Sequence, residues 1–266
     1  MPQLGSMRLD RISSEDIQRV KQQLCSRSPK TANNVLTVLN TLLKVAVEWQ
    51  VIGRVPCTVR LLRVPPQSAD FLDPDQFERL VEVARADGTE ALFLVLLGGE
   101  AGLRCGEMMG LKWSDVGLEG NKLQVARSIW KGEVTTTKGE RIRYVDITQR
   151  LAAALRAHRS AGPYVVAQAT GEPLTQKMVR VRVRRISARA GRRHGVHILR
   201  HTFCSRLAMR GAAPSLIQAL AGHRHLMTTQ RYMHVARAAT ASAIRLLEPQ
   251  GRGDRGAIVE EAHASA

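Results

Sequence analysis

The chain has 266 residues, 44% of them hydrophobic and 4% aromatic, which is typical of an aliphatic-rich globular protein with one large or two small domains. Its 40 basic residues outnumber its 23 acidic ones, and a formal charge of +17 is the electrostatic signature of a nucleic-acid-binding protein. The charge extends over too long a region for one membrane-surface helix, and the longest apolar run, residues 91–97, is far too short to span a bilayer.

The cysteines indicate neither a zinc site nor a disulfide framework. They are far apart in the sequence and form no Cys-x-x-Cys pair: Cys25, Cys57, Cys105 and Cys204. The first residues lack the basic region and apolar stretch of a secretory signal. We therefore expect a cytoplasmic protein in a reducing compartment.

Residues 8–66 are predicted to form a small helical domain. One helix begins near Ser13, where a hydroxyl side chain followed by acidic residues is typical of a helix start. A stronger helix runs from Thr31 to about Trp49, with one apolar face made of Val35, Leu36, Leu39, Leu42, Leu43, Ala46 and Val47. Residues 60–67 contain two prolines and are predicted to be an extended basic linker, so the domain boundary is placed there.

Residues 67–248 are predicted to form a second domain, which makes the fold class mostly α with a small antiparallel β-sheet (α+β). Asp73 and Pro74 are typical of a helix start. Helices are predicted from there to about residue 85, and at 91–97, 104–111, 179–190, 199–210, 214–221 and 229–247. Gly98 and Gly99 are expected to break the second of these. Alternation of period two predicts strands at 122–130, 134–137 and 141–147, and residues 249–266 are predicted to be a disordered tail.

The positive charge is concentrated in one segment that lacks acidic residues. Residues 173–247 contain no Asp or Glu, but carry Lys177 and fourteen arginines. Such a surface suits a polyanion. Carboxylates that would hold a metal are missing there, while Tyr232 lies among guanidinium and imidazole groups. This combination predicts metal-free phosphoryl transfer on DNA.

Single residues of this segment have ordinary explanations. His197 and Arg200 are three positions apart and share one side of a helix start, where the guanidinium fork matches two phosphate oxygens. A structural histidine beside a solvated arginine is nevertheless the commoner arrangement. His223 follows a glycine that simply ends a helix, and Tyr232 alone is most often a half-buried core residue. The order and the spacing of these residues together support a functional site.

In that order and spacing the chain strongly resembles the tyrosine recombinases, the phage-integrase family. The matching segments are Ala101-Gly-Leu-Arg-Cys-Gly-Glu107 with Leu111-Lys-Trp-Ser-Asp115, Thr137-Lys138-Gly139, His197-Ile-Leu-Arg-His-Thr-Phe203, Ala221-Gly-His223 and Thr228-Thr-Gln-Arg-Tyr232. The ordered match spans residues 101–232 and is highly specific. The helix that begins at Thr31 resembles, more loosely, the family's helical DNA-clamping domain.

The resemblance implies a role for each matched residue. Tyr232 would attack the scissile phosphate and form a 3′-phosphotyrosyl link while a 5′-hydroxyl leaves. Arg104 and Arg200 would hold the two non-bridging oxygens, and Lys138 would protonate the leaving oxygen.

His197 and His223 would hydrogen-bond the phosphate and assist proton transfer from the tyrosine. The resemblance also implies double-stranded DNA as the partner, a homotetramer on two DNA sites, accessory DNA-bending proteins, and neither a cofactor nor a metal.

Elementary chemistry supports this division of labour. A free tyrosine has a pKa of about 10, and nearby cations are expected to favour its phenolate. Guanidinium groups that face the pentacoordinate phosphate stabilise its extra negative charge, each such donor contributing about 3–4 kcal/mol. A covalent intermediate conserves the energy of the phosphodiester, so religation needs no ATP.

Some residues have an alternative interpretation. Glu107 is predicted to be a buried partner that orients a helix or an arginine rather than a catalytic acid. Lys138 also fits a plain hairpin turn. His194, His197 and His201 have a spacing that could suit zinc, but no carboxylate base lies nearby in the sequence, and His201 is predicted to be structural.

Three rival functions stay open at this point. Residues 208–221 resemble a helix-turn-helix, which would suit a DNA-binding regulator without catalysis. A catalytically decayed integrase fragment is a second alternative, because the N-terminal domain is shorter than the resemblance leads one to expect. A type IB topoisomerase-like relaxase would use similar residues.

Overall fold

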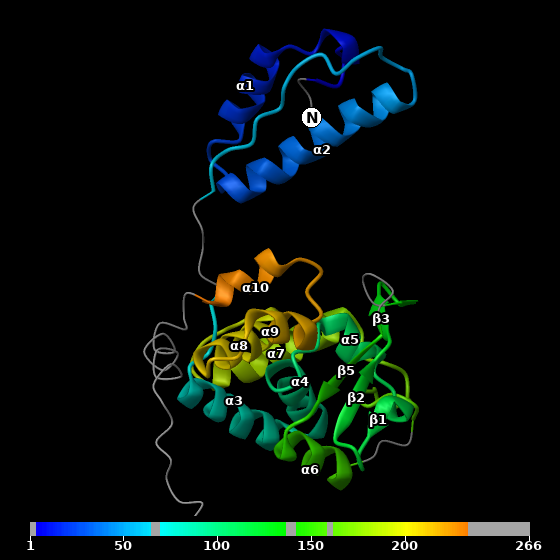
Figure 1. Ribbon diagram of the computed structural model, residues 1–266, viewed down its shortest axis with the longest axis vertical. Helices are drawn as coiled ribbons and strands as arrows, with labels where there is room; N and C mark the ends of the chain where they lie inside the picture. Colours follow the sequence, from blue (N-terminus) through cyan, green and yellow to red (C-terminus); the bar gives the residue numbers. More distant parts are fainter. Residues whose placement is uncertain (1–3, 65–69, 137–141, 159–161, 234–266) are drawn as a thin grey trace, which may run out of the picture. The chain divides into compact units, whose positions relative to one another are not determined.

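The computed structural model describes residues 4–64, 70–136, 142–158 and 162–233. Its packing divides the chain into two compact units, Met1–Gln67 and Ser68–Ala266. Figure 1 shows the helices of both units and the strands of the second. The proposal that the first unit clamps DNA stays a prediction.

The first unit is helical. A short 3-10 helix, Leu9–Arg11, precedes α1 (Ser14–Gln23) and α2 (Pro29–Glu48). Ser13 and Asp16 form a capping box at the start of α1, as the sequence predicts. The start of α2 lies two residues before the predicted Thr31, because Ser28 caps the helix and proline is favoured at its first position.

A small apolar core holds these two helices together. Its buried side chains are Ile12, Ile17, Val20, Leu36, Leu39, Leu43, Ala46, Ile52 and Cys57. The extended segment that returns along α2 is fixed by Asn33, whose amide group donates to the carbonyl of Leu62 at 2.9 Å and accepts from its N–H at 2.7 Å.

Helices also dominate the second unit. They are α3 (Pro74–Asp87), α4 (Thr89–Gly99), α5 (Cys105–Gly110), α6 (Gln149–Ala157), α7 (Gln176–Arg189), α8 (His197–Met209), α9 (Pro214–Ala221) and α10 (Leu226–Met233). Figure 1 shows α4 surrounded by other helices, and it contacts α3, α5, α6, α7 and α8. The sequence analysis missed α6, although Thr148 caps it and Leu151 and Leu155 share its buried face.

The end of α4 differs from the prediction. Gly98 and Gly99 were expected to break the helix, but both lie within it and are buried. A Cβ atom on Gly99 would lie 2.2 Å from the Phe77 ring, and one on Gly98 would lie 2.7 Å from Cβ of Leu199. These glycines therefore allow α3 and α8 to pack closely against α4.

Within the described residues, the strands of this unit form two small antiparallel sheets rather than one. The first has the order β1 (Val116–Gly117), β2 (Lys122–Val125), β5 (Arg143–Asp146), and the second pairs β3 (Arg127–Trp130) with β4 (Glu133–Thr136). The single strand predicted at 122–130 is wrong because β2 pairs with β5 whereas β3 pairs with β4, so the chain changes sheets at Ala126.

The remaining predicted boundaries agree to within a few residues. Asp73 caps α3 with Pro74 at its first position, as predicted. The helix predicted at 229–247 begins earlier, at Leu226, and its part beyond residue 233 lies outside the described residues, as does the tail at 249–266. Within the described ranges, no helix is long and apolar enough to cross a membrane.

A buried carboxylate joins α5 to β5. Glu107 is 2% exposed and accepts two hydrogen bonds from Arg143, at 3.0 and 2.8 Å. It also accepts from the side chain and from the backbone N–H of Arg104, each at 2.8 Å. Burial alone would raise the pKa of Glu107, but the hydrogen bond and charge of Arg143, with the charge of Arg104, lower it to about 2.

Leu42 and Leu43 of α2 offer a matched test of the first core. Leu43 is fully buried, whereas its neighbour Leu42 is 58% exposed. We expect Leu43→Ala to lower the free energy of unfolding by about 2–5 kcal/mol, through lost burial and a residual cavity. Leu42→Ala should change it by about 0.5 kcal/mol or less. Urea unfolding followed by circular dichroism measures both, and equal effects would contradict the described core.

Glu107 gives a second test, which depends on pH. Glu107→Gln leaves two partly buried guanidinium groups without an anion, and should lower the free energy of unfolding at pH 7 by about 3 kcal/mol. Because the folded-state pKa is depressed, the contribution of Glu107 is complete above the unfolded pKa of about 4.5 and is lost as the pH falls toward 2.

The difference between wild type and Glu107→Gln should therefore shrink on acidification. Urea unfolding at pH 7 and at pH 3 measures it. Glu119→Gln, at an exposed position, serves as the control and should leave the free energy of unfolding unchanged at both pH values. A difference that stays constant with pH would contradict the assigned ionisation.

Candidate active site

Three helices and one loop bring the candidate residues together. Arg104 caps the start of α5, and Arg200 lies in α8, whose first residue is His197. His223 follows the end of α9, and Tyr232 lies in α10. Lys138, the sixth candidate, lies outside the described residues.

Arg200 is a buried cation, and one of its nitrogen donors makes no hydrogen bond within the described residues. It is 5% exposed, and its Nη1 donates to the carbonyl of Gly102 at 2.6 Å. Its Nη2 is buried and has no hydrogen-bond partner among the residues that the structure describes. Burial, and then the charge of Arg104, lower the pKa of Arg200 to about 10, so it stays charged at neutral pH. An unsatisfied buried donor is costly, and an anion that reaches it would remove that cost.

Arg104 is held in place from two sides. Its Nη1 donates to Glu107 at 2.8 Å, and its Nη2 donates to the carbonyl of Gly222 at 2.6 Å. Its side chain is 28% exposed, so one side of the guanidinium still faces solvent. Because the charges of Arg104 and Arg200 act on each other and on His223, the two arginines form one cationic cluster with His223 at its edge.

Glycines around Arg104 have a packing function. Gly102 has φ +65°, and a Cβ atom there would lie 2.5 Å from the ring of Phe203. The glycines of this segment thus let the chain approach its own helices closely, which fixes Arg104 relative to α8.

His223 is a neutral group at the edge of the cluster. Burial, followed by the charges of Arg200 and Arg104, lowers its pKa to about 3. Its Nδ1 and the hydroxyl of Thr229 are 2.9 Å apart. Its ring lies nearly parallel to that of Tyr232, with 6.1 Å between centroids and 7° between planes.

Tyr232 is almost completely enclosed. It is 3% exposed and packs with Phe203, Cys204, Ala208, Ile217 and Ala221. Burial raises its pKa to about 12, although the nearby cations Arg200, Arg231 and Arg104 act in the opposite direction. The cations thus favour the phenolate, as predicted, but desolvation of the hydroxyl outweighs their charge and the net effect is a raised pKa.

Two residues at the site were missed or undervalued by sequence reasoning. Arg143 of β5 binds Glu107 and also donates through Nε to the carbonyl of Leu220 at 3.1 Å. His201, predicted to be structural, has its Nδ1 only 2.6 Å from the hydroxyl of Tyr232. Its position four residues after His197, on the same helix face, was the available signal.

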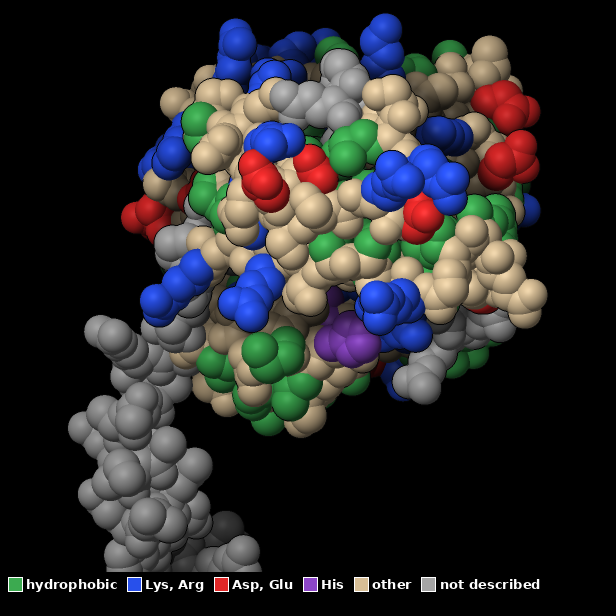
Figure 2. All heavy atoms as spheres, turned by 90° about the horizontal axis from the view of Figure 1, so that it is seen from above, with side chains coloured by type: hydrophobic (Ala, Val, Ile, Leu, Met, Phe, Trp, Pro, Cys, Tyr) green, Lys and Arg blue, Asp and Glu red, His purple; other side chains and the backbone are tan. Residues whose placement is uncertain are grey.

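The surface of this unit is rich in arginine. In Figure 2, basic side chains are spread over the visible face and exceed the acidic ones. On α7, Arg185 and Arg189 bind Asp87 at 2.6 and 2.9 Å, while the exposed Arg180 and Arg184 have no acidic partner among the described residues.

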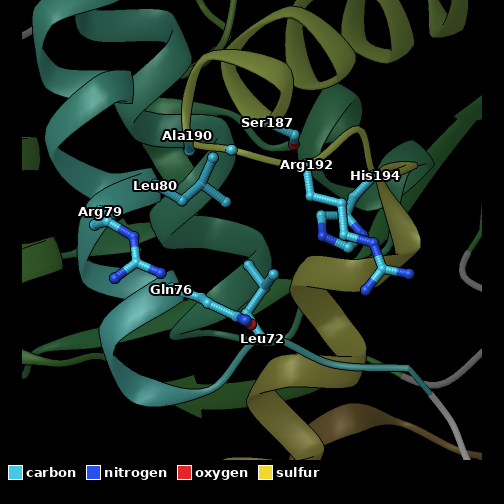
Figure 3. Close-up of a pocket in the computed structure, with 9 residues that line it drawn as sticks. Leu72, Gln76, Arg79, Leu80, Ser187, Ala190, Arg192 and His194 are labelled. Carbon is cyan, nitrogen blue, oxygen red and sulfur yellow. The ribbon is translucent and has the colours of Figure 1, made fainter.

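A cavity of about 190 Å³ lies apart from these groups, between α3 and the end of α7. Figure 3 shows Gln76 and Arg79 on one side of it, and Arg192 and His194 on the other. None of the candidate catalytic side chains lines it. In the part of the chain that is described, no three His, Cys, Asp or Glu residues are grouped as metal ligands.

Several known proteins are similar in sequence to this chain. The tyrosine recombinase XerC-like protein of Caldanaerobacter subterraneus subsp. tengcongensis is 26% identical over 92% of this chain and 73% of its own length. XerC from Methylobacterium sp. (strain 4-46) is 33% identical over 60% of this chain. XerC from Xanthomonas campestris pv. campestris (strain B100) is 30% identical over 66% of it. The chain spans 50% and 55% of the length of these last two relatives.

Solved structures share the fold. The Tn1549 transposon integrase in complex with a circular intermediate DNA has a TM-score of 0.74 at 22% identity, covering 90% of this chain and 88% of that one. The XerA recombinase has a TM-score of 0.56 at 24% identity, covering 91% and 86%. The sequence model of the phage integrase family matches residues 70–239, which is well over half of the chain. With Arg104, Arg200, His223 and Tyr232 brought close together, the chain belongs to the phage integrase family, the tyrosine recombinases.

Proposed function

We propose that the protein is a site-specific DNA recombinase, which cuts and rejoins DNA through a 3′-phosphotyrosyl link to Tyr232. The observation that carries this proposal is the convergence of Arg104, Arg200, His223 and Tyr232, which come from different elements of a chain of this family. The chemistry assigned to these side chains requires neither ATP nor a metal ion.

The two arginines bind the scissile phosphate. The unpartnered Nη2 of Arg200 and the solvent-facing side of Arg104 donate to its non-bridging oxygens. These oxygens gain negative charge in the pentacoordinate transition state, so fixed guanidinium groups stabilise that state more than the ground state. Loss of one such donor slows catalysis by about 10²–10³-fold.

Each strand transfer is reversible. The oxygen of Tyr232 forms a bond to phosphorus as the bond to the 5′-oxygen breaks, and Lys138 protonates that oxygen. The phosphotyrosyl ester conserves the energy of the diester, and a 5′-hydroxyl then attacks it to reseal a strand. His197, exposed at the start of α8, hydrogen-bonds the phosphate.

DNA binding must also open the surroundings of Tyr232. The tyrosine is 3% exposed in the chain without DNA, so no phosphate reaches its hydroxyl until neighbouring side chains of α8, α9 or α10 shift. This requirement suppresses reaction of the nucleophile in the absence of a DNA site.

Double-stranded DNA is the proposed partner. Arginines without acidic partners supply phosphate contacts, which account for most of the affinity and make it salt-dependent. Related structures include XerH bound to a palindromic difH substrate and a lambda integrase dimer bound to a COC′ core site. We propose that residues 8–66 clamp the duplex and that four copies act on two sites in the cytoplasm, with accessory DNA-bending proteins.

Tyr232→Phe tests the nucleophile. A pool of nicked duplexes with a randomised core lets the freed strand end diffuse away, so covalent protein–DNA adducts accumulate. We expect wild type to form adducts that resist denaturant, and Tyr232→Phe to form none, because it lacks the attacking oxygen. Gel electrophoresis measures the adducts, and sequencing of the captured DNA gives the target site.

Other outcomes distinguish the rival functions. Binding of the pool without adducts from wild type would favour a DNA-binding regulator or a decayed integrase. Relaxation of supercoiled plasmid without exchange between two captured sites would favour a type IB topoisomerase-like relaxase.

Arg184 and Arg189 of α7 test the phosphate contacts. Arg184 has no acidic partner, whereas Arg189 binds Asp87 at 2.9 Å. We expect Arg184→Gln to reduce the slope of log K against log salt by about one, the loss of one phosphate contact. Arg189→Gln should change it less, because Asp87 partly offsets its charge. Fluorescence anisotropy with labelled duplex measures the slopes, and an unchanged slope for Arg184→Gln would exclude this contact.

A further inference from the structure

The cavity between α3 and the end of α7 is a second place where the protein could hold a ligand. Its volume is about 190 Å³, and its walls come from the segment before α3, from α3, from the end of α7 and from the loop that leads to α8. One water molecule needs roughly 15 Å³ of such volume. The cavity therefore has room for a small organic molecule.

A buried hydroxyl in this cavity makes no hydrogen bond within the described residues. It belongs to Ser187, which is 1% exposed and lies in the last turn of α7. A serine within a helix usually bonds the carbonyl four positions earlier or points to solvent, and Ser187 does neither. Because an unsatisfied buried hydroxyl costs free energy, a ligand atom that bonds it is favoured.

Side chains that can bind anions face each other across the cavity. Figure 3 shows Gln76 and Arg79 on one side and Arg192 and His194 on the other. Both arginines are exposed, and neither has an acidic partner among the described residues. The carboxylate nearest to this lining belongs to Asp70, which is 3.9 Å from Nδ1 of His194 and itself 64% exposed. The two sides therefore carry two unpaired guanidinium charges.

Backbone hydrogen bonds fix the second side. Gly191 has φ +113°, in the region that favours glycine. The chain turns there, and the N–H of Arg192 donates to the carbonyl of Ser187 at 3.0 Å. Arg192 is thereby held next to the residue whose hydroxyl is unsatisfied.

Apolar side chains lie between the two cationic sides. Leu72 and Leu80 are 4% and 1% exposed, and Ala190 is half-buried. The N–H of Leu72 donates to Oγ1 of Thr202 in α8 at 2.9 Å, which anchors this part of the wall. The middle of the cavity therefore favours hydrocarbon groups over a hydrated ion.

We propose that this cavity binds a small organic dianion, namely a short dicarboxylate. One carboxylate binds Arg79 and the amide group of Gln76, and the other binds Arg192 and His194. The hydrocarbon between them packs against the leucines, and one carboxylate oxygen accepts from the hydroxyl of Ser187. Hydrogen bonds between guanidinium and carboxylate groups are the strong ones in such a site. The inference goes beyond the proposed function and does not depend on it, because Tyr232 takes no part.

A DNA backbone fits these features less well. A phosphate of a duplex could reach the exposed arginines, but the Ser187 hydroxyl is enclosed and the middle of the cavity is apolar. A small molecule with two anionic ends and a hydrocarbon body satisfies all three features at once.

Titration of the full-length protein with glutarate, followed by ¹H–¹⁵N NMR at constant ionic strength, tests the proposal. We expect the backbone amides of Leu80, Gly191 and Arg192 to shift, with a Kd of about 1 mM for a ligand of this size. Butyrate has a hydrocarbon body but only one carboxylate, so it should bind about tenfold more weakly or worse.

Variants separate the cavity from a general attraction to a basic protein. Arg79→Gln should weaken glutarate binding about tenfold, and Ser187→Ala about threefold. Ser187→Ala should also fold normally, because it removes a hydroxyl that is unsatisfied. Arg85→Gln is the matched control: Arg85 is exposed on the same helix, has no acidic partner among the described residues and does not line the cavity, so its Kd should equal that of wild type.

Three results would overturn the proposal. The first is the absence of shifts at these amides in wild type up to about 20 mM glutarate. The second is equal binding of butyrate and glutarate, and the third is equal weakening by Arg85→Gln and Arg79→Gln. If glutarate does not bind and Arg79→Gln lowers the salt dependence of duplex binding, Arg79 contacts a DNA phosphate instead. Adduct formation by Tyr232 is measured separately, so its failure would leave this site unaffected.

Discussion

Glu107 accepts hydrogen bonds from Arg104 and Arg143 while it is 2% exposed, and the geometry of the active site depends on this arrangement. Arg104 also donates a hydrogen bond to the carbonyl of Gly222, and Arg143 donates one to the carbonyl of Leu220. One carboxylate therefore fixes α5, β5 and the end of α9 relative to one another. Because a buried anion strongly favours paired cations, Glu107 holds the guanidinium of Arg104 in a fixed position.

The close packing of α8 supplies the other half of the site. Gly98 and Gly102 have no Cβ, which leaves room for Leu199 and Phe203 of α8 beside α4 and the loop that follows it. Arg200, which lies between those two residues in the sequence, is thereby held against the carbonyl of Gly102. Its second donor stays unsatisfied at a buried position. The packing of α8 thus holds Arg200 in a position where one of its donors is unsatisfied, and a bound anion would satisfy it.

The same enclosure surrounds the hydroxyl of Tyr232, the proposed nucleophile. Tyr232 is buried and has a raised pKa, His223 and His201 have lowered ones, and Arg200 stays cationic. The site therefore carries a net positive charge, which the negative charge of a DNA phosphate would offset. Substrate binding would therefore change both access to the tyrosine and the basicity of its neighbours, which couples recognition of DNA to its cleavage.

Local features of the sequence determined much of this protein. The caps at Ser13 and Asp73, the apolar face of α2, and the order of Arg104, His197, Arg200, His223 and Tyr232 are visible in the sequence, since helix starts and motif spacing involve neighbouring residues. Only the tertiary structure decided that residues 122–130 divide between two sheets, that Arg143 shares Glu107 with Arg104, and that His201 contacts the tyrosine hydroxyl. The last two contacts join residues that are 36 and 31 positions apart in the sequence. Burial also raises the pKa of Tyr232 although cations lie nearby. Desolvation and long-range pairing arise when the chain is packed, so no local pattern contains them.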